Sequence, residues 1–120
     1  MKPNISKTSF GSIKVAGEGI QHDIFITLGG KIKKRKKKLS KAVHGTSHII
    51  SLDEIRHVYE DGARGIIIGS GQYGAAELSA EAGEFLKSKT CQVHLSPTPE
   101  AIQRWNDAEG EWIGLFHITC

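Results

Sequence analysis

The sequence of 120 residues contains few cysteines, few prolines and no long apolar run. Its two cysteines, Cys91 and Cys120, are far apart and neither belongs to a C-x-x-C motif, which excludes a disulfide framework, a zinc finger and a redox motif. No stretch approaches the roughly eighteen apolar residues of a membrane helix, and the first residues lack the apolar core of a signal peptide. We therefore expect a soluble cytoplasmic protein with reduced thiols, no membrane contact and no bound metal.

Charge is divided unevenly along the chain. Residues 1–50 carry eleven Lys and Arg against two acidic residues, whereas residues 51–120 carry five against eleven. The formal net charge of +3 therefore combines +9 in the first part with −6 in the second. A chain of this length can bury about two thirds of its unfolded surface, so we expect one domain over residues 1–120.

The stretch over residues 64–74 contains an apolar run followed by three closely spaced glycines. The run at residues 65–68 does not alternate with polar residues and contains three β-branched isoleucines, which predicts a strand covered on both faces near the centre of a sheet. The glycines allow a tight turn, and residues 75–89 then have the pattern of a helix. We expect this strand, loop and helix to organise the fold.

The first part of the chain has the pattern of short strands. Strands are predicted at residues 10–15 and 23–27, where β-branched and aromatic residues are frequent. Gly29-Gly30 predicts a hairpin turn, after which Lys31-Ile32-Lys33 resumes the alternation. Because lysines discourage unwanted strand pairing, we place this last strand at the edge of the sheet.

The second part predicts an α/β fold with three helices. Ser51 and Glu54 have capping-box spacing, which marks the start of the first helix. The helix over residues 75–89 is the second, and the third follows residue 97. Residues 112–119 are apolar at both alternating sets of positions and belong inside the sheet.

Residues 90–96 complete a β-α-β unit. Alternation places Cys91, Val93 and Leu95 on one buried side of this strand, so Cys91 is interpreted as a small core residue and not as a nucleophile. The Ser-Pro-Thr-Pro sequence that follows ends the strand, with Thr98 predicted as the N-cap of the third helix.

The glycine spacing Gly69-x-Gly71-x-x-Gly74 matches the dinucleotide-binding fingerprint. The following strand has no acidic residue to hold a ribose, and the chain lacks a second mononucleotide half, so no cofactor is predicted. A helix starting at residue 75 would still offer free N–H groups to an anion. The competing interpretation, which we favour, is a glycine-rich turn without a ligand.

Eight of the sixteen basic residues form a basic run: Lys31, Lys33, Lys34, Arg35, Lys36, Lys37, Lys38 and Lys41. Such a run suits nucleic acid or an acidic partner. No aromatic residue interrupts it to stack on a base, and no zinc-finger or RNA-recognition sequence accompanies it. We therefore favour a solvated edge and treat nucleic acid as the weaker alternative.

The patterns around His44, His48 and His117 favour structural roles over metal binding or catalysis. His44 and His48 lie in a Gly-Thr-Ser loop without a third ligand nearby, which argues against a metal site. His117 shares a face with apolar residues of its strand, so we expect a hydrogen-bonded structural histidine there.

Four stretches together produce a resemblance to a family: Ile68-Gly69-x-Gly71, Pro97-Thr98-Pro99-Glu100-Ala101, Asn106, and Gly114-Leu-Phe-His-Ile-Thr-Cys120. The chain resembles, over residues 10–120, the Mth-domain family, which includes the adipogenesis-associated Mth-domain protein and, more distantly, a mitochondrial complex I assembly factor. The resemblance implies a three-layer α/β fold around a mixed sheet. It implies little about activity, because the family is largely uncharacterised and its known cellular roles are those of assembly or regulatory factors.

Three functional hypotheses follow, and whether the protein is an enzyme stays open. The first is a non-enzymatic interaction module with a protein partner, because no nucleophile–base pair or acid–base pair can be assembled from these motifs. The second is a site for a small, anionic ligand where the strands end, with candidate residues Gly69, Ser70, Gly71, Gln72, Tyr73, Gly74 and Thr98, and with His48 as a candidate base. The third is nucleic-acid binding through the basic run. The oligomeric state is not encoded in any motif.

Overall fold

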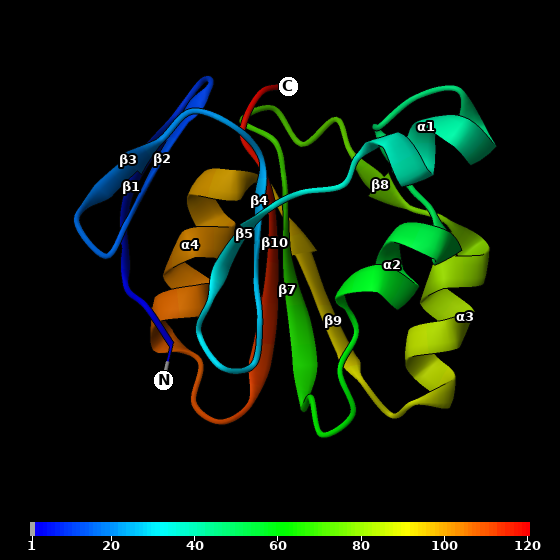
Figure 1. Cartoon of the computed structure of the whole chain (residues 1–120). Helices are drawn as coiled ribbons and strands as arrows, with labels where there is room; N and C mark the ends of the chain where they lie inside the picture. Colours follow the sequence, from blue (N-terminus) through cyan, green and yellow to red (C-terminus); the bar gives the residue numbers. More distant parts are fainter. Residues whose placement is uncertain (1) are drawn as a thin grey trace.

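A computed structural model describes residues 2–120, and its centre is a five-stranded sheet in the order β5-β4-β10-β7-β9. Figure 1 shows this sheet between two layers, with α4 and the N-terminal strands on one face and α2 and α3 on the other. The sheet strands are β4 (Ile24–Ile26), β5 (Ile32–Lys34), β7 (Gly65–Ser70), β9 (Gln92–Ser96) and β10 (Trp112–His117). The predicted three-layer α/β architecture is confirmed.

The sheet is mixed, as the family resemblance implied. β10 runs parallel to β7, which runs parallel to β9, whereas β4 is antiparallel to both β10 and β5. β10 occupies the middle position, and the strand predicted at the centre, β7, lies next to it. The carboxyl ends of β5, β10, β7 and β9 therefore reach the same rim of the sheet.

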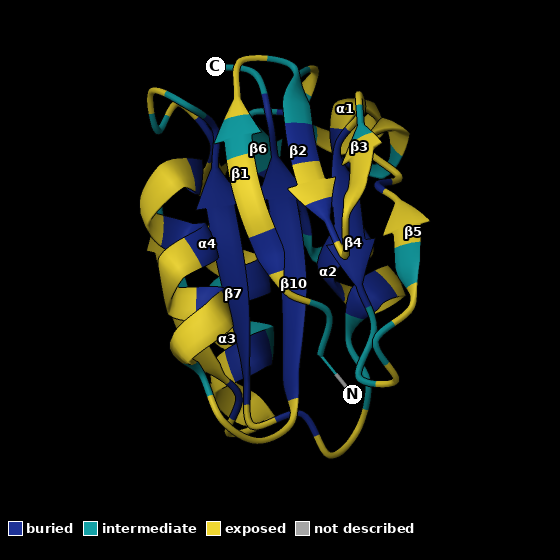
Figure 2. Ribbon diagram, turned by 90° about the vertical axis from the view of Figure 1, so that its left-hand side faces the viewer, coloured by how far each residue is buried: buried dark blue, intermediate teal, exposed yellow. Residues whose placement is uncertain are grey.

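β7 and β10 are continuous apolar runs, and each strand contributes side chains to the hydrophobic cores on both faces of the sheet. Every residue of each strand is buried, and both strands are dark blue along their length in Figure 2. One core contains Ile67, Trp105 and Phe116 beneath α4, and the other contains Ile66 and Ile68 beneath α2 and α3. Odd and even positions of β7 thus enter different layers, as the pleat of a strand requires.

The N-terminal layer is a three-stranded antiparallel sheet of β1 (Ile5–Ser9), β2 (Ser12–Val15) and β3 (Glu18–Ile20). The strand predicted over residues 10–15 begins later, because Phe10 and Gly11 form a turn in which Gly11 has a φ of 79°. β1 is fastened to α4 (Thr98–Asp107) by Asn106, whose side chain accepts from Ile5 N at 2.9 Å and donates to Ile5 O at 2.7 Å. The predicted hairpin at Gly29-Gly30 joins β4 to β5.

The structure contains four helices and not three. The additional helix, α1 (Lys38–His44), takes up the end of the basic run and stops at Gly45, which has a φ of 72°. α2 (Leu52–Val58) follows the short strand β6 (Ile49–Ile50). Lysine is a good helix former, but α1 has only 7 residues, which is too short for its apolar pattern to predict a helix.

The helix predicted from residue 75 begins later, because α3 spans Ala80–Ser88. Residues 77–78 instead form β8 (Glu77–Leu78), which pairs in parallel with β6. Ser79 then caps α3, its hydroxyl accepting from Ala82 N at 3.1 Å. None of the helices in residues 2–120 is long and apolar enough to cross a membrane.

Candidate functional site

Arg35 is the one member of the basic run that is buried, with 4% of its surface exposed. Its backbone N–H donates to Asp23 O at 2.9 Å, which extends the β4–β5 pairing beyond β5. Its guanidinium donates from Nε to Glu54 Oε2 at 2.6 Å, and from Nη2 to Glu54 Oε1 at 3.0 Å and to Ser47 O at 2.8 Å. The prediction that Arg35 belongs to an exposed basic patch is wrong.

Glu54 is available to Arg35 because the predicted capping box forms only in part. The Ser51 hydroxyl accepts from Glu54 N at 3.1 Å, as a capping box requires. The reciprocal bond is replaced: Ser51 N donates to the Ser40 hydroxyl at 2.9 Å, and that hydroxyl donates to Glu54 Oε1 at 2.5 Å. The carboxylate is thereby turned from its own helix toward the guanidinium.

Asp23 is the second carboxylate of this network. Its Oδ2 accepts from Arg35 Nη1 at 3.0 Å and lies 2.7 Å from His117 Nδ1, while its Oδ1 accepts from Ile118 N at 2.9 Å. Burial alone would raise the pKa of Asp23, but the hydrogen bonds from His117 and Ile118 and the neighbouring positive charges lower it to about 2. Asp23 is therefore ionised at neutral pH and can only accept hydrogen bonds.

His117 is fixed in one tautomer by this carboxylate. Because Asp23 only accepts, His117 Nδ1 carries the hydrogen, and Nε2 lies 3.3 Å from the Thr119 hydroxyl. The ring of His48 packs edge-on against that of His117, with 5.4 Å between the centroids. The expectation of a hydrogen-bonded histidine at position 117 is confirmed. We call Asp23, Arg35, Glu54 and His117 the buried charge network.

A cavity of about 200 Å³ opens beside this network at the carboxyl ends of β5 and β10. Its lining includes Asp23, Lys34, Arg35, Lys37, Ile118 and Thr119. Open α/β sheets hold ligands at this rim, where the ends of parallel strands meet. We call this cavity the rim pocket.

The loop over residues 69–74, considered above as an alternative anion site, is filled by the chain itself. Gln72 N donates to Thr119 O at 2.7 Å, and Tyr73 N and Ala75 N donate to Cys120 O at 3.2 and 3.1 Å. A Cβ at Gly71 would lie 2.2 Å from the backbone of Cys120. The backbone N–H groups of residues 71–76 all have partners within the chain, and no helix begins at residue 75.

Of the other predicted site residues, Thr98 has structural partners, Tyr73 is exposed and Ser70 is buried. Thr98 is the first residue of α4, one position after the N-cap Pro97, and its hydroxyl donates to His117 O at 2.5 Å and accepts from Gly71 N at 2.9 Å. Tyr73 is exposed and packs beside Phe10, with 6.2 Å between the rings. The hydroxyl of Ser70 is buried without a hydrogen-bond partner among residues 2–120.

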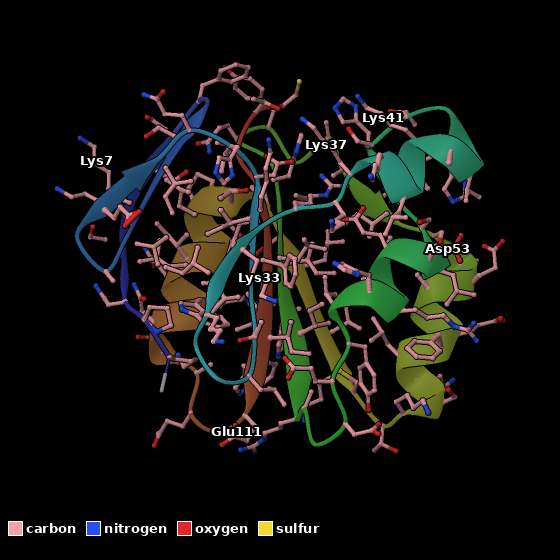
Figure 3. All side chains as sticks on the ribbon, in the orientation of Figure 1. Lys7, Lys33, Lys37, Lys41, Asp53 and Glu111 are labelled. Atoms are coloured by element: carbon pink, nitrogen blue, oxygen red, sulfur yellow. The ribbon has the colours of Figure 1, made fainter. Side chains whose placement is uncertain are left out.

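The lysines of the basic run are all exposed. Figure 3 shows Lys33, Lys37 and Lys41 spread along β5, the segment after it and α1. A second concave surface next to the rim pocket is lined by residues 34–38, which include four of these lysines. Within residues 2–120, no group of three His, Cys, Asp or Glu side chains could hold a metal ion, and Cys91 and Cys120 are free thiols.

The outer edge of β9 is the second candidate surface. β9 is the last strand of the sheet, and no strand in residues 2–120 pairs with its outer edge. Val93 and Leu95 are 38% and 40% exposed, so their predicted burial is wrong, although Cys91 is buried as expected. α3 starts five residues later than predicted.

Sequence reasoning missed Asp23, Arg35 and Glu54 as members of one site. Asp23 directly precedes β4, Arg35 lies in a lysine run and Glu54 is in the first turn of α2, and neither their spacing nor their order forms a known motif. One signal was present: Arg35 is the only arginine among seven lysines in the run. Arginine is preferred where two carboxylates must be bridged, because its planar fork has five donors.

Comparison with known proteins identifies a family. A model of a protein family of unknown function, DUF498/DUF598, matches residues 5–115. The chain belongs to this family. The DUF498/DUF598 description assigns no activity to its members, and the Mth-domain name stays a prediction.

Solved structures agree with this membership. A conserved hypothetical protein, PH1505 from Pyrococcus horikoshii, is 30% identical with a TM-score of 0.88, over 98% of this chain and 99% of that one. The structure of MT938 is also 30% identical, with a TM-score of 0.85 over 99% and 100% of the two chains. A protein of Bordetella parapertussis shares the fold at 13% identity and a TM-score of 0.74, over 98% and 96% of the chains. The DUF498/DUF598 fold thus extends over nearly the whole of this chain.

Proposed function

We propose that this domain is a non-enzymatic interaction module in which β9 pairs with an extended segment of a partner protein. The observation that supports the proposal is the open edge of β9, where Val93 and Leu95 are exposed. The five residues of β9 include no proline and no Lys, Arg, Asp or Glu. An edge strand without such residues is a template for another strand.

The opposite edge of the same sheet supports this interpretation by contrast. β5 is also an edge strand, but two of its three residues are lysines, and Lys31 precedes it. Charged side chains, lysine above all, are a common way to keep an edge from pairing. The chain therefore protects one edge by charge and leaves the other available.

The chemistry of β9 specifies the kind of partner. Added strands gain affinity from main-chain hydrogen bonds and specificity from alternate side chains. Val93 and Leu95 lie on one face of β9, so a suitable partner segment is extended and apolar at alternate positions. Because only a short strand is available, we expect a weak or transient complex.

A site-specific crosslinking experiment tests the proposal. The full chain would be expressed with a photoreactive benzoylphenylalanine at position 93, and as a control at position 43, since Val43 on α1 is also exposed. We expect a discrete crosslinked protein from position 93 and none from position 43. A synthetic peptide from the crosslinked region should then shift the backbone amide resonances of residues 92–96.

Two outcomes contradict the proposal. Equal crosslinking from both positions indicates non-specific apolar contact, and a peptide that leaves the β9 amides unchanged places the interaction elsewhere. If position 93 crosslinks only to a second copy of this chain, β9 mediates self-association and not binding of another protein. The double substitution Val93→Lys with Leu95→Lys should abolish peptide binding, whereas Val43→Lys should leave it unchanged.

A further inference from the structure

We propose that the rim pocket binds a phosphate group, held by the ammonium groups of Lys34 and Lys37 and by the Thr119 hydroxyl. This inference concerns a different surface from β9 and does not depend on the proposed interaction function. The rim pocket lies where β5 and β10 end, on the side of the sheet where α/β folds place ligands. Its volume of about 200 Å³ is smaller than the pockets that hold drug-sized molecules, which indicates a small ligand or one group of a larger ligand.

The charge of the lining favours an anion. Three basic side chains, Lys34, Arg35 and Lys37, and one acidic side chain, Asp23, line the pocket. Arg35 is shared by two carboxylates, Asp23 and Glu54, so these three groups together carry a charge of −1, whereas Lys34 and Lys37 form no salt bridge among residues 2–120. The two lysines reverse the sign, and the charged groups at the pocket sum to +1.

Two members of the buried charge network, Asp23 and Arg35, line the pocket, and hydrogen bonds hold both in place. Both oxygens of Asp23 are used by hydrogen bonds, and Arg35 is held on two sides by Glu54 and Asp23. A site built on such fixed groups does not have to order them when a ligand binds, and this lowers the entropic cost of binding.

Arg35 is not itself a ligand in this proposal. Its Nη1 donates to Asp23 Oδ2 at 3.0 Å and lies 3.4 Å from His117 Nδ1, so this group is directed into the buried charge network. The phosphate is therefore held by Lys34, Lys37 and Thr119.

Phosphate fits this set of groups better than a carboxylate does. Carboxylates are recognised most specifically by the bidentate fork of arginine, and the fork of Arg35 is occupied by Glu54. Lysine acts as a point charge and is a common ligand of phosphate oxygens. A doubly charged phosphate also matches the two unpaired ammonium groups. The Thr119 hydroxyl, which lies 3.3 Å from His117 Nε2, would turn its single hydrogen from that nitrogen to a phosphate oxygen.

The test is a titration of the full chain with inorganic phosphate and with glycerol phosphate, followed by amide chemical shifts at about 0.15 M salt. Lys34→Gln with Lys37→Gln removes the two pocket charges. Lys31→Gln with Lys33→Gln is the matched control, since it removes two exposed charges from the same run that do not line the pocket. We expect saturable shifts at residues 22–23, 34–37 and 118–119.

The pocket variant should weaken phosphate binding at least about tenfold and the control no more than about twofold, because distant exposed charges are screened at this salt concentration. Thr119→Val should weaken binding and Thr119→Ser should restore it. If both double variants lose phosphate affinity equally, the binding depends on overall positive charge and not on the rim pocket, which contradicts the proposal. If neither compound shows saturable binding at millimolar concentration, the proposal is overturned. If acetate binds as tightly as phosphate, the pocket is a site for carboxylates and not one selective for phosphate.

Discussion

The two edges of the central sheet are held in different ways. β5 is short and exposed on its outer side, and it is fastened through Arg35 to α2 and β10 by ionic hydrogen bonds. β9 is attached to β7 by pairing over residues 92–96 and leaves apolar side chains in solvent. Figure 2 shows the contrast between the exposed β5 and the buried central strands. One edge is thus stabilised and protected by charge, while the other is stabilised by packing and left open.

The largest effect is expected at the β5 edge. Arg35→Ala would leave Asp23 and Glu54 buried without their counter-charge, and we expect a loss of about 3–5 kcal/mol in the free energy of unfolding. Lys34→Ala, one residue away and exposed, should change it by less than about 0.5 kcal/mol. Urea denaturation of both variants measures the difference. Equal losses would show that Arg35 does not fasten this edge.

The pH dependence of stability tests the contribution of Asp23 to the β5 edge. The pKa of Asp23 is lowered from 3.8 to about 2 in the folded protein, so its contribution is complete above pH 4 and is lost as the pH falls toward 2. The shift corresponds to about 2 kcal/mol. Asp23→Asn should be less stable at neutral pH and should lose less stability between pH 4 and pH 2. Parallel curves for wild type and variant, from denaturant unfolding at each pH, would contradict the assignment.

At the β9 edge, stability and binding should separate. Val93→Lys places a charge on a residue that is already partly exposed, so the free energy of unfolding should change by less than about 1 kcal/mol. Pairing with a partner strand should nevertheless be lost. Thermal unfolding and the peptide titration, carried out on the same preparation, report the two quantities. A large loss of stability would mean that Val93 belongs to the core.

The smallest effect on folding is expected when a charge is removed from the β5 edge. This change also tests directly whether charge is what distinguishes β5 from β9. Lys33→Val should leave the free energy of unfolding within about 0.5 kcal/mol of the wild type. It should also raise the tendency to self-associate, because an apolar β-branched residue would replace one of the two lysines of this edge strand. Light scattering over a concentration series would detect this, with Lys41→Val on α1 as the control.

Strands and turns with strong local signals were predictable. β7 and β10 are continuous apolar runs, Gly29-Gly30 makes the hairpin between β4 and β5, and Ser51 caps α2. Each of these signals acts within a few residues, so the sequence alone contains it. No local signal of this sort gives the mixture of parallel and antiparallel strands, which only the family resemblance implied.

The candidate site depends on long-range contacts and was not predictable in the same way. Arg35 meets Asp23 and Glu54 across 12 and 19 residues and lies near His117 across 82. Its burial follows from the pairing of β5 and the position of α2, neither of which is visible in a run of lysines. The choice between a bare turn and an anion site at residues 69–74 could not be made from the sequence for a related reason, because the contact of this loop with residues 119–120 is also long-range.

The placement of Arg35 means that the order of residues in the basic run matters as well as their charge. Exchanging Arg35 with Lys36 would leave composition, net charge and isoelectric point unchanged. A lysine at position 35 offers a single ammonium group, which cannot match the planar fork that joins two carboxylates and a carbonyl. Two sequences that any count of charges treats as identical would therefore differ in whether β5 stays fastened to the domain.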